Sequence, residues 1–264
     1  MRISRTKLID ALGHVYIWIC LVLFVAPFFA LVGYSLTGPG GTYALENFSY
    51  VLGSFGENLM WSFVITGLTL VINSLITLPA AYALVRHPFP GKRTLYSALT
   101  LPLYVPAAVV GMALLLSYQF TYHLTTSMWG LVFAMVLATF PLMLTPTMVA
   151  MKDLPLVFEE AAECLGASKW QTWRRIVFPL IGPGYSAGLL VTFVIVFNEY
   201  LVTLFVHPSG LITAPLRVFN LVRTAGVLPT TAALAVTMQL VSLAVVLIFV
   251  RVFGTRYFKG TYII

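Results

Sequence analysis

A short polar stretch between two long apolar segments holds the residues most able to do chemistry in this chain. Glu159, Glu160 and Glu163 lie close together, and with Asp153 just upstream they make up four of the eight acidic residues. Carboxylates can bind metals or activate water, but no histidine lies in this stretch and Cys164 is its one cysteine. We therefore interpret the stretch as a docking element for a soluble partner.

The same stretch carries the signals of a helical hairpin over residues 153–179. Pro155 suits a first helical turn, where Asp153 can accept bonds from free amides. Gly166 stands where that helix should end, because glycine adopts the left-handed conformation without steric cost. Ser168 and Gln171 fit a capping box that starts a second helix.

The first helix of this hairpin is predicted to have two faces. The three glutamates are expected on one polar face, which could meet basic groups of a partner. The opposite, mostly apolar face would contain Leu156, Phe158, Ala161, Ala162 and Leu165.

Three polar residues inside apolar segments are candidates for a translocation path. Glu199 is the one formal charge within a predicted membrane segment, with Asn198 beside it. A charge at the bilayer centre costs about 2.5–3.5 kcal/mol on insertion scales, so such residues are often functional. Glu199 could attract a cation on the path, or pair with an arginine or a partner subunit. Asn73 could line the path or simply bond between helices.

Catalytic and cofactor signatures are missing from the sequence. Cys20 and Cys164 are far apart, and the four histidines are scattered. The phosphate-binding pattern G-x-x-x-x-G-K-[ST] does not occur. We therefore expect a non-enzymatic chain with no metal and no bound cofactor.

The elements that position these residues follow from composition. The chain is 60% hydrophobic and only 9% charged, whereas soluble domains contain about 25% charged residues. It is therefore predicted to be an all-α, polytopic membrane protein in a lipid bilayer. Because its apolar run is too long for a signal peptide, we expect the first helix to be retained. The six predicted spans are residues 14–36, 59–84, 94–117, 128–151, 180–206 and 230–250, within a single domain, 1–264.

The basic residues indicate an orientation. With the N-terminus in the cytoplasm, thirteen of the fifteen Lys and Arg residues fall on the inside and only Arg217 and Arg223 fall outside. This is a strong positive-inside bias, so both termini and the hairpin are predicted to be cytoplasmic. The bias also explains the net charge of +7 without nucleic acid.

The hairpin carries the resemblance to a known family. Glu160-Ala161-Ala162, Gly166, Ile176 and Pro179 keep every spacing of the EAA motif of binding-protein-dependent ABC importer permeases, and Phe178 replaces the usual leucine. The six-span layout resembles the same family (type I, MetI-like). The basic turn 86–93 and Asn198-Glu199-Tyr200 resemble its spermidine/putrescine branch.

The resemblance implies a permease subunit that forms half of a translocation pathway. Its hairpin would contain the coupling helix, which inserts into a separate ATPase, so ATP would bind and be hydrolysed on that partner. Implied partners are an ABC ATPase dimer, a second permease subunit expected to differ in sequence, and an extracytoplasmic solute-binding protein at the bacterial inner membrane. The coupling residues would be Glu160, Ala161, Ala162, Gly166, Ile176 and Pro179.

The solute implied by the branch is a polyamine or another small charged molecule. A stand-alone secondary transporter or channel is the alternative, but it would favour more intramembrane charges or inverted repeats. A membrane enzyme would need clustered catalytic side chains, which are missing here.

Overall fold

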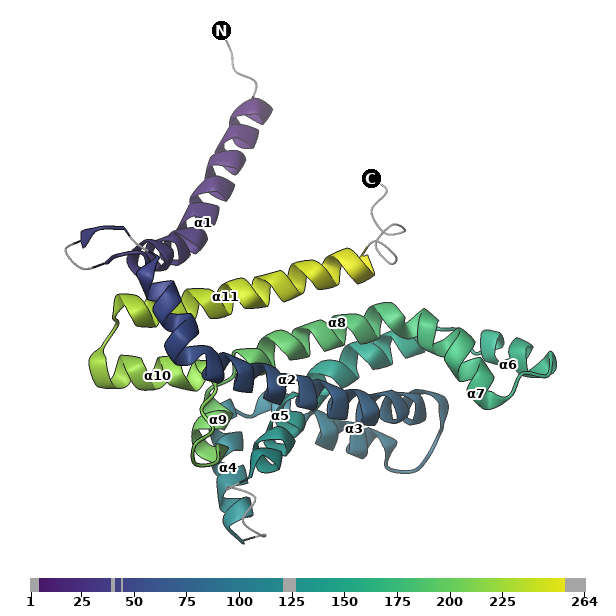
Figure 1. The fold of residues 1–264 in the computed structure, drawn as a ribbon. Helices are drawn as coiled ribbons and strands as arrows, with labels where there is room; N and C mark the ends of the chain where they lie inside the picture. Colours follow the sequence, from purple (N-terminus) through teal and green to yellow (C-terminus); the bar gives the residue numbers. More distant parts are fainter. Residues whose placement is uncertain (1–4, 39–40, 44, 121–126, 255–264) are drawn as a thin grey trace. The chain divides into compact units, whose positions relative to one another are not determined.

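The computed structural model describes residues 5–38, 41–43, 45–120 and 127–254, and within these ranges the chain is helical (Figure 1). An isolated bridge between Thr37 and Tyr43 is the one β-type contact recorded there. This confirms the predicted all-α class. The helices are α1 (Arg5–Ser35), α2 (Glu46–Arg86), α3 (Lys92–Thr100), α4 (Ala107–Phe120), α5 (Met128–Asp153), α6 (Val157–Cys164), α7 (Lys169–Thr172), α8 (Phe178–Phe197), α9 (Leu201–Val206), α10 (Ala214–Ala225) and α11 (Pro229–Phe249).

Several of these helices are long and apolar enough to cross a membrane. Within the described residues, five pass on their own, and a sixth span results if one bent helix pair is counted as a single crossing. The five are Leu12–Ser35, Glu46–Arg86, Met128–Asp153, Lys169–Phe197 and Pro229–Val252.

The third predicted span, 94–117, is not one straight helix. α3 and the 3-10 turn Leu101–Tyr104 are bent by 110° from α4. Val105 between them is extended, because the following proline disfavours a helical conformation in the residue before it. Pro106 also lacks the amide hydrogen needed to continue the helix.

The fifth predicted span, 180–206, is not one continuous helix in the structure. α8 ends at Phe197, and α9 is a separate short helix. At the break, the Asn198 side chain donates to the Val194 carbonyl, 2.8 Å away. The Glu199 carboxylate accepts from the Val202 amide at 3.0 Å. These local bonds replace helical backbone bonds, as short polar side chains commonly do at helix ends.

The chain forms two compact units. One comprises residues 1–56 and 220–239, and the other comprises residues 57–219 and 240–264. In the first unit, the Tyr34 hydroxyl at the end of α1 donates to the Val227 carbonyl, 2.9 Å away. The Asn47 amide donates to the Ser35 and Thr37 carbonyls at 2.9 and 3.0 Å. The single domain 1–264 stays a prediction.

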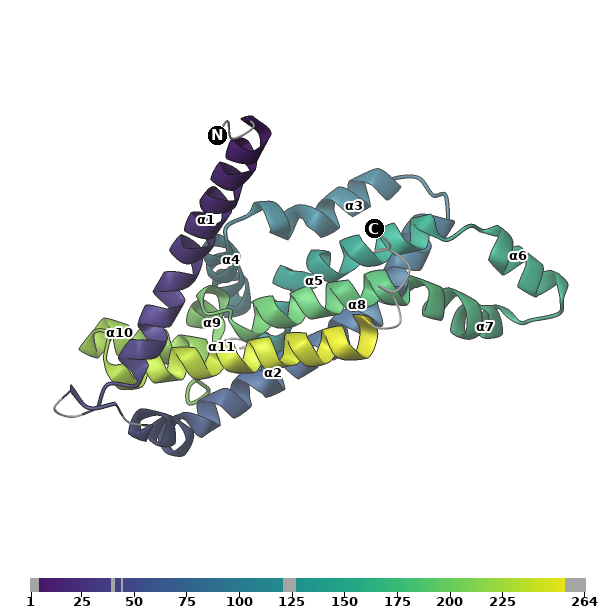
Figure 2. The same cartoon turned by 90° about the horizontal axis from the view of Figure 1, so that it is seen from above.

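The second unit is organised around α5 and α8, which lie side by side (Figures 1 and 2). Their close approach depends on glycine. A Cβ added at Gly184 would lie 2.6 Å from the Pro146 carbonyl oxygen, and one at Gly188 would lie 2.9 Å from the Pro146 ring. Small residues at helix contacts are typical of membrane proteins, where backbones must approach closely to gain packing energy.

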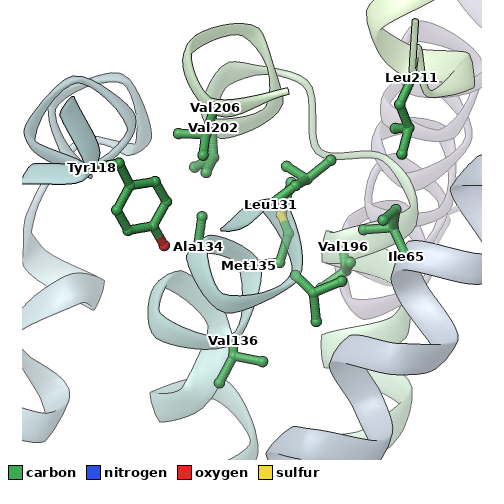
Figure 3. Packing of buried hydrophobic residues seen from close by; sticks show 11 residues of the cluster. Ile65, Tyr118, Leu131, Ala134, Met135, Val136, Val196, Val202, Val206 and Leu211 are labelled. Atoms are coloured by element: carbon green, nitrogen blue, oxygen red, sulfur yellow. The ribbon is translucent and has the colours of Figure 1, made fainter. Parts of the chain in front are cut away.

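Buried apolar side chains from five helices, α2, α4, α5, α8 and α9, meet in one core cluster of this unit (Figure 3). Leu131, Val132 and Ala134 on α5 are fully buried and pack near Val202 on α9 and Ile65 on α2. A separate cluster of Met151, Leu154, Val177 and Ile181 lies where α5 and α8 lead into the segment α6–α7. This second cluster fixes the base of the hairpin.

Candidate functional site

The predicted hairpin is present at one end of the α5–α8 pair (Figures 1 and 2). It consists of α6, a turn at Gly166, α7 and a π-helical segment, Trp173–Val177, that continues into α8. The polar interval of the sequence is therefore a folded element with its own hydrogen bonds. It is not an irregular loop.

The turn after α6 is confirmed. Gly166 has φ +88°, and its amide donates to the Glu163 carbonyl at 2.9 Å. The Ala167 amide donates to the Ala162 carbonyl at 3.0 Å. These two bonds form a Schellman motif, which satisfies carbonyls left free at the helix end. A Cβ added at Gly166 would have no atom within 4 Å, so only the backbone angle requires glycine there.

The start of α7 is confirmed as well. The Ser168 hydroxyl accepts from the Gln171 amide, 3.3 Å away, and the Gln171 side chain accepts from the Ser168 amide at 2.9 Å. This is the reciprocal capping box. The connection between the two helices is therefore hydrogen-bonded on both sides.

The expected cap at the start of α6 was wrong. α6 begins after Leu156, and no side chain caps it. Asp153 instead forms the last residue of α5, and Pro155 lies between the two helices. The extended conformation of Leu154, next to Pro155, places Asp153 outside the first turn of α6.

The motif residues differ in exposure. Glu160, Ala161 and Gly166 are exposed, whereas Ala162 is 7% exposed. Ile176 is half-buried within the π-helical segment, and Pro179 is exposed in the first turn of α8. Pro179 has no amide hydrogen, which is compatible with a widened helical turn just before it.

One glutamate of the predicted acidic face was misplaced. Glu159 is only 5% exposed and points into the protein, together with Ala162 three residues on. Glu160 and Glu163 remain exposed. The predicted apolar face is also not buried as a unit, since Phe158 and Leu165 are exposed. Only Glu159 and Ala162 of α6 are thus buried, and its exposed side carries both acidic and apolar groups.

A buried ion pair explains why Glu159 turns inward. Its Oε1 accepts from Arg86 Nε at 2.7 Å, and its Oε2 accepts from the Tyr82 hydroxyl at 3.0 Å. Arg86 also donates to the Leu154 carbonyl at 2.9 Å. We call Tyr82, Arg86 and Glu159 the hairpin clamp. It fastens α6 to the end of α2, 73 residues earlier in the chain.

Sequence reasoning did not identify the clamp. Arg86 stood out only as part of a basic turn after an apolar segment, and Tyr82 did not stand out at all. A signal was present, since tyrosine and arginine four residues apart share one helix face near a helix end. The partner on a distant segment could not be read from spacing.

Glu199 and Asn198 lie at the break between α8 and α9. Glu199 is half-buried, and its carboxylate is bonded within the first turn of α9. Asn198 is exposed but also donates to the Ser242 hydroxyl on α11 at 3.2 Å. Both side chains therefore hold the local break together.

Asn73 lies apart from those two residues. It is fully buried, and its amide nitrogen donates to the Thr139 hydroxyl of α5 at 3.0 Å. Its amide oxygen is buried without a partner among the described residues. No hydrogen bond recorded within the described ranges joins Asn73 to Asn198 or Glu199. Its observed contact is the interhelical bond.

In the described part of the chain, no three His, Cys, Asp or Glu side chains gather as metal ligands would. The exposed side of the hairpin suits docking. α6 presents carboxylates, small residues and exposed apolar side chains, while the clamp holds its inner side.

Apolar helices of membrane length, together with a fastened polar hairpin at one end, are typical of a polytopic membrane protein. The chain belongs to the family described as binding-protein-dependent transport system inner membrane components, whose model matches residues 73–259. It is the non-catalytic permease subunit of an ABC importer.

Individual relatives agree with this family. A probable sulfate transport system permease protein from Chlorokybus atmophyticus is 31% identical over 164 residues, which span 57% of each chain. A spermidine/putrescine transport system permease protein from Haemophilus influenzae is 28% identical over 89% of this chain and 91% of that relative.

A solved structure shows the same fold. A bacterial ABC transporter involved in the import of the acidic polysaccharide alginate contains a chain that matches with a TM-score of 0.70. The match covers 98% of this chain and 99% of that chain at 18% identity.

Proposed function

We propose that this chain forms half of the translocation pathway of an importer and that its α6–α7 hairpin docks onto a separate ATPase. The observation that carries the proposal is the two-sided hairpin. Glu160, Ala161 and Gly166 face outward at the motif positions. On the other side, Glu159 is bound to Arg86. A docking element needs an exposed contact surface and a firm connection to the part it moves, and this hairpin has both.

Two connections would carry movement of the hairpin into the permease. The clamp leads from α6 to the end of α2 through hydrogen bonds of 2.7 and 3.0 Å. The chain itself leads from α7 through the π-helical segment into α8. A displacement produced by ATP-driven closure of the partner would thus reach two membrane helices of the same unit. In this proposal, the ATP and its hydrolysis belong to the ATPase.

Substitutions in the turn test the coupling. Gly166→Val should uncouple ATP hydrolysis from solute uptake, because a β-branched residue is strained at φ +88°. Gly166→Asn is the matched control, since asparagine tolerates the left-handed conformation. Glu160→Lys reverses a charge on the exposed side and should uncouple as well. Normal solute-stimulated ATPase activity of the assembled transporter with both Gly166→Val and Glu160→Lys would refute the docking role.

The proposed assembly contains two ATPase subunits, a second permease of different sequence and a solute-binding protein outside the membrane. Family membership supports the ATPase and the binding protein. The positive-inside bias supports cytoplasmic termini and a cytoplasmic hairpin. Copurification of an ATPase chain and a second permease with the tagged protein tests this composition.

The proposed solute is a polyamine or another small charged molecule. The support is the relative named for spermidine and putrescine, which aligns over most of both chains. A relative named for sulfate makes a small anion the competing choice. Thermal unfolding of the cognate binding protein with spermidine, putrescine, sulfate or molybdate decides between them. A melting temperature raised by polyamines supports a polyamine, and one raised only by an oxyanion supports a small anion instead. A melting temperature that none of the four solutes raises would count against the proposal.

A further inference from the structure

A pocket lies beside the end of α2. It has a volume of about 360 Å³ and is lined by Leu84, Val85, Lys92, Arg93, Tyr96, Met148 and Lys152. The lining comes from the last turn of α2, the first turns of α3 and the last turns of α5. We call it the basic pocket. None of the coupling or clamp residues lines it.

The basic pocket lies where two membrane helices end. α2 ends at Arg86 and α5 ends at Asp153, and both are long and apolar enough to span a bilayer. Arg86 donates to the carbonyl of Leu154, so the two ends are at the same level. Such a position corresponds to the headgroup region of a membrane. α3 carries exposed Leu95 beside basic residues, as interfacial helices do.

The lining combines three cations with an apolar wall. Lys92, Arg93 and Lys152 contribute the charge, and no carboxylate lines the pocket among the described residues. Lys92 donates to the His87 carbonyl at 3.2 Å, whereas no ion pair is recorded for any of the three within the described ranges. The wall includes Val85 and Tyr96, which are partly exposed and pack against the buried cluster of Leu84 and Met148.

We propose that the basic pocket binds an anionic phospholipid. The phosphate would lie among the three cations, and an acyl chain would lie against the partly exposed Val85 and Tyr96. Basic pockets between membrane helices are suited to anionic headgroups, and Tyr96 is an amphipathic side chain of the kind found at membrane interfaces. A free phosphate ion would leave the apolar wall uncovered, so the lipid satisfies more of the pocket. The inference stands on the pocket and the helix ends and is independent of the coupling role.

Native mass spectrometry of the assembled transporter tests this site. The complex is stripped of lipid and titrated with phosphatidylglycerol or with phosphatidylcholine. The wild type should bind one phosphatidylglycerol per copy of this chain more tightly than phosphatidylcholine. Arg93→Gln with Lys152→Gln should weaken phosphatidylglycerol binding about 25-fold, or about fivefold for each lost charge. If the double variant assembles poorly, Arg93→Gln alone should weaken phosphatidylglycerol binding about fivefold.

Two controls make the result specific. Arg174→Gln with Arg175→Gln removes the same number of exposed positive charges outside the pocket and should leave the affinity unchanged. Inorganic phosphate and glycerophosphoglycerol, which lack acyl chains, should not displace the lipid. Equal weakening in both double variants, unchanged binding in the pocket variants, or displacement by either chainless anion would overturn the proposal.

Discussion

Two adjacent glutamates of α6 have different environments. Glu159 is buried and bound to Arg86 and Tyr82, while Glu160 is exposed at the motif position. A buried carboxylate is stable only when it is paired, because desolvation strongly disfavours the charge. The pair therefore fixes the rotation of α6 about its axis, and this rotation decides that Glu160 and Ala161 face outward.

Removing one partner of the clamp should be costly. Arg86→Met leaves Glu159 buried without its cation and should destabilise the hairpin by about 3–5 kcal/mol. We expect a lower melting temperature of the purified transporter and weaker coupling of ATP hydrolysis to uptake. Arg86→Met combined with Glu159→Leu should recover part of the melting temperature. Arg174→Met is the control at an exposed arginine, and an equal loss in that control would contradict the clamp.

Substitutions at Glu199 can separate the effect of its charge from the effect of its hydrogen bond to Val202. Its carboxylate accepts from the Val202 amide, and glutamine can still provide an accepting oxygen. We predict that Glu199→Gln lowers the uptake rate without preventing assembly, whereas Glu199→Ala also loosens the start of α9. Uptake kinetics and copurification with the partner subunits measure the two effects. Unchanged uptake in Glu199→Gln would assign Glu199 a purely structural role.

The site residues were predictable to the extent that they are local. Gly166 and the Ser168–Gln171 capping box follow from neighbouring positions, and the structure confirms both. The inward turn of Glu159 was not predictable, since it depends on a residue 73 positions away. The roles of the motif residues in coupling stay predictions.

At the level of elements, the close contact between α5 and α8 depends on glycines, which have no side chain. A Cβ at Gly184 would come within 2.5 Å of the Ala150 Cβ and 2.6 Å of the Pro146 carbonyl oxygen. The Pro146 carbonyl belongs to the backbone of α5, so it cannot move aside as the end of a flexible side chain could. The approach of the two helices is therefore set by glycine on one side and by a proline-containing helix on the other.

Gly184→Ala should separate α5 from α8. Overpacking of this kind costs about 1–3 kcal/mol, so we expect a lower melting temperature of the detergent-purified transporter. Gly67→Ala is the matched control, because nothing lies within 4 Å of a Cβ at that helical position. That control should be neutral or slightly stabilising, since alanine favours helix more than glycine does. Equal melting temperatures for both variants would argue against the contact.

The helix pattern was predictable where one apolar segment makes one helix. The first, fourth and sixth predicted spans match α1, α5 and α11 within a few residues, apart from the N-terminal extension of α1. The bend near Pro106 follows from the prolines inside the third segment, which are expected to break its helix. The end of α8 before Asn198 was not predicted. The length of an apolar run in the sequence indicates that a membrane segment is present. A polar side chain or a proline within that run decides whether its helix continues straight.

For the whole molecule, the predicted orientation can be tested through native cysteines. Cys164 is exposed at the end of α6. If the hairpin is cytoplasmic, a membrane-impermeant maleimide should label Cys164 in inside-out vesicles and leave it unlabelled in right-side-out vesicles. Cys20→Ser removes the other thiol, and Cys164→Ser is the negative control. Labelling from the opposite side would reverse the topology.

The connection between α6 and α7 has a consequence for chain length. The Schellman motif ends with Gly166 and Ala167, and the capping box begins with Ser168. Every residue between the two helices therefore takes part in one of these motifs. One inserted residue would break the Schellman bond pattern or the capping box. Natural insertions and epitope tags should therefore be rejected here, although the segment is exposed. Among related proteins, the α6–α7 connection should therefore keep the same number of residues, while other loops vary in length.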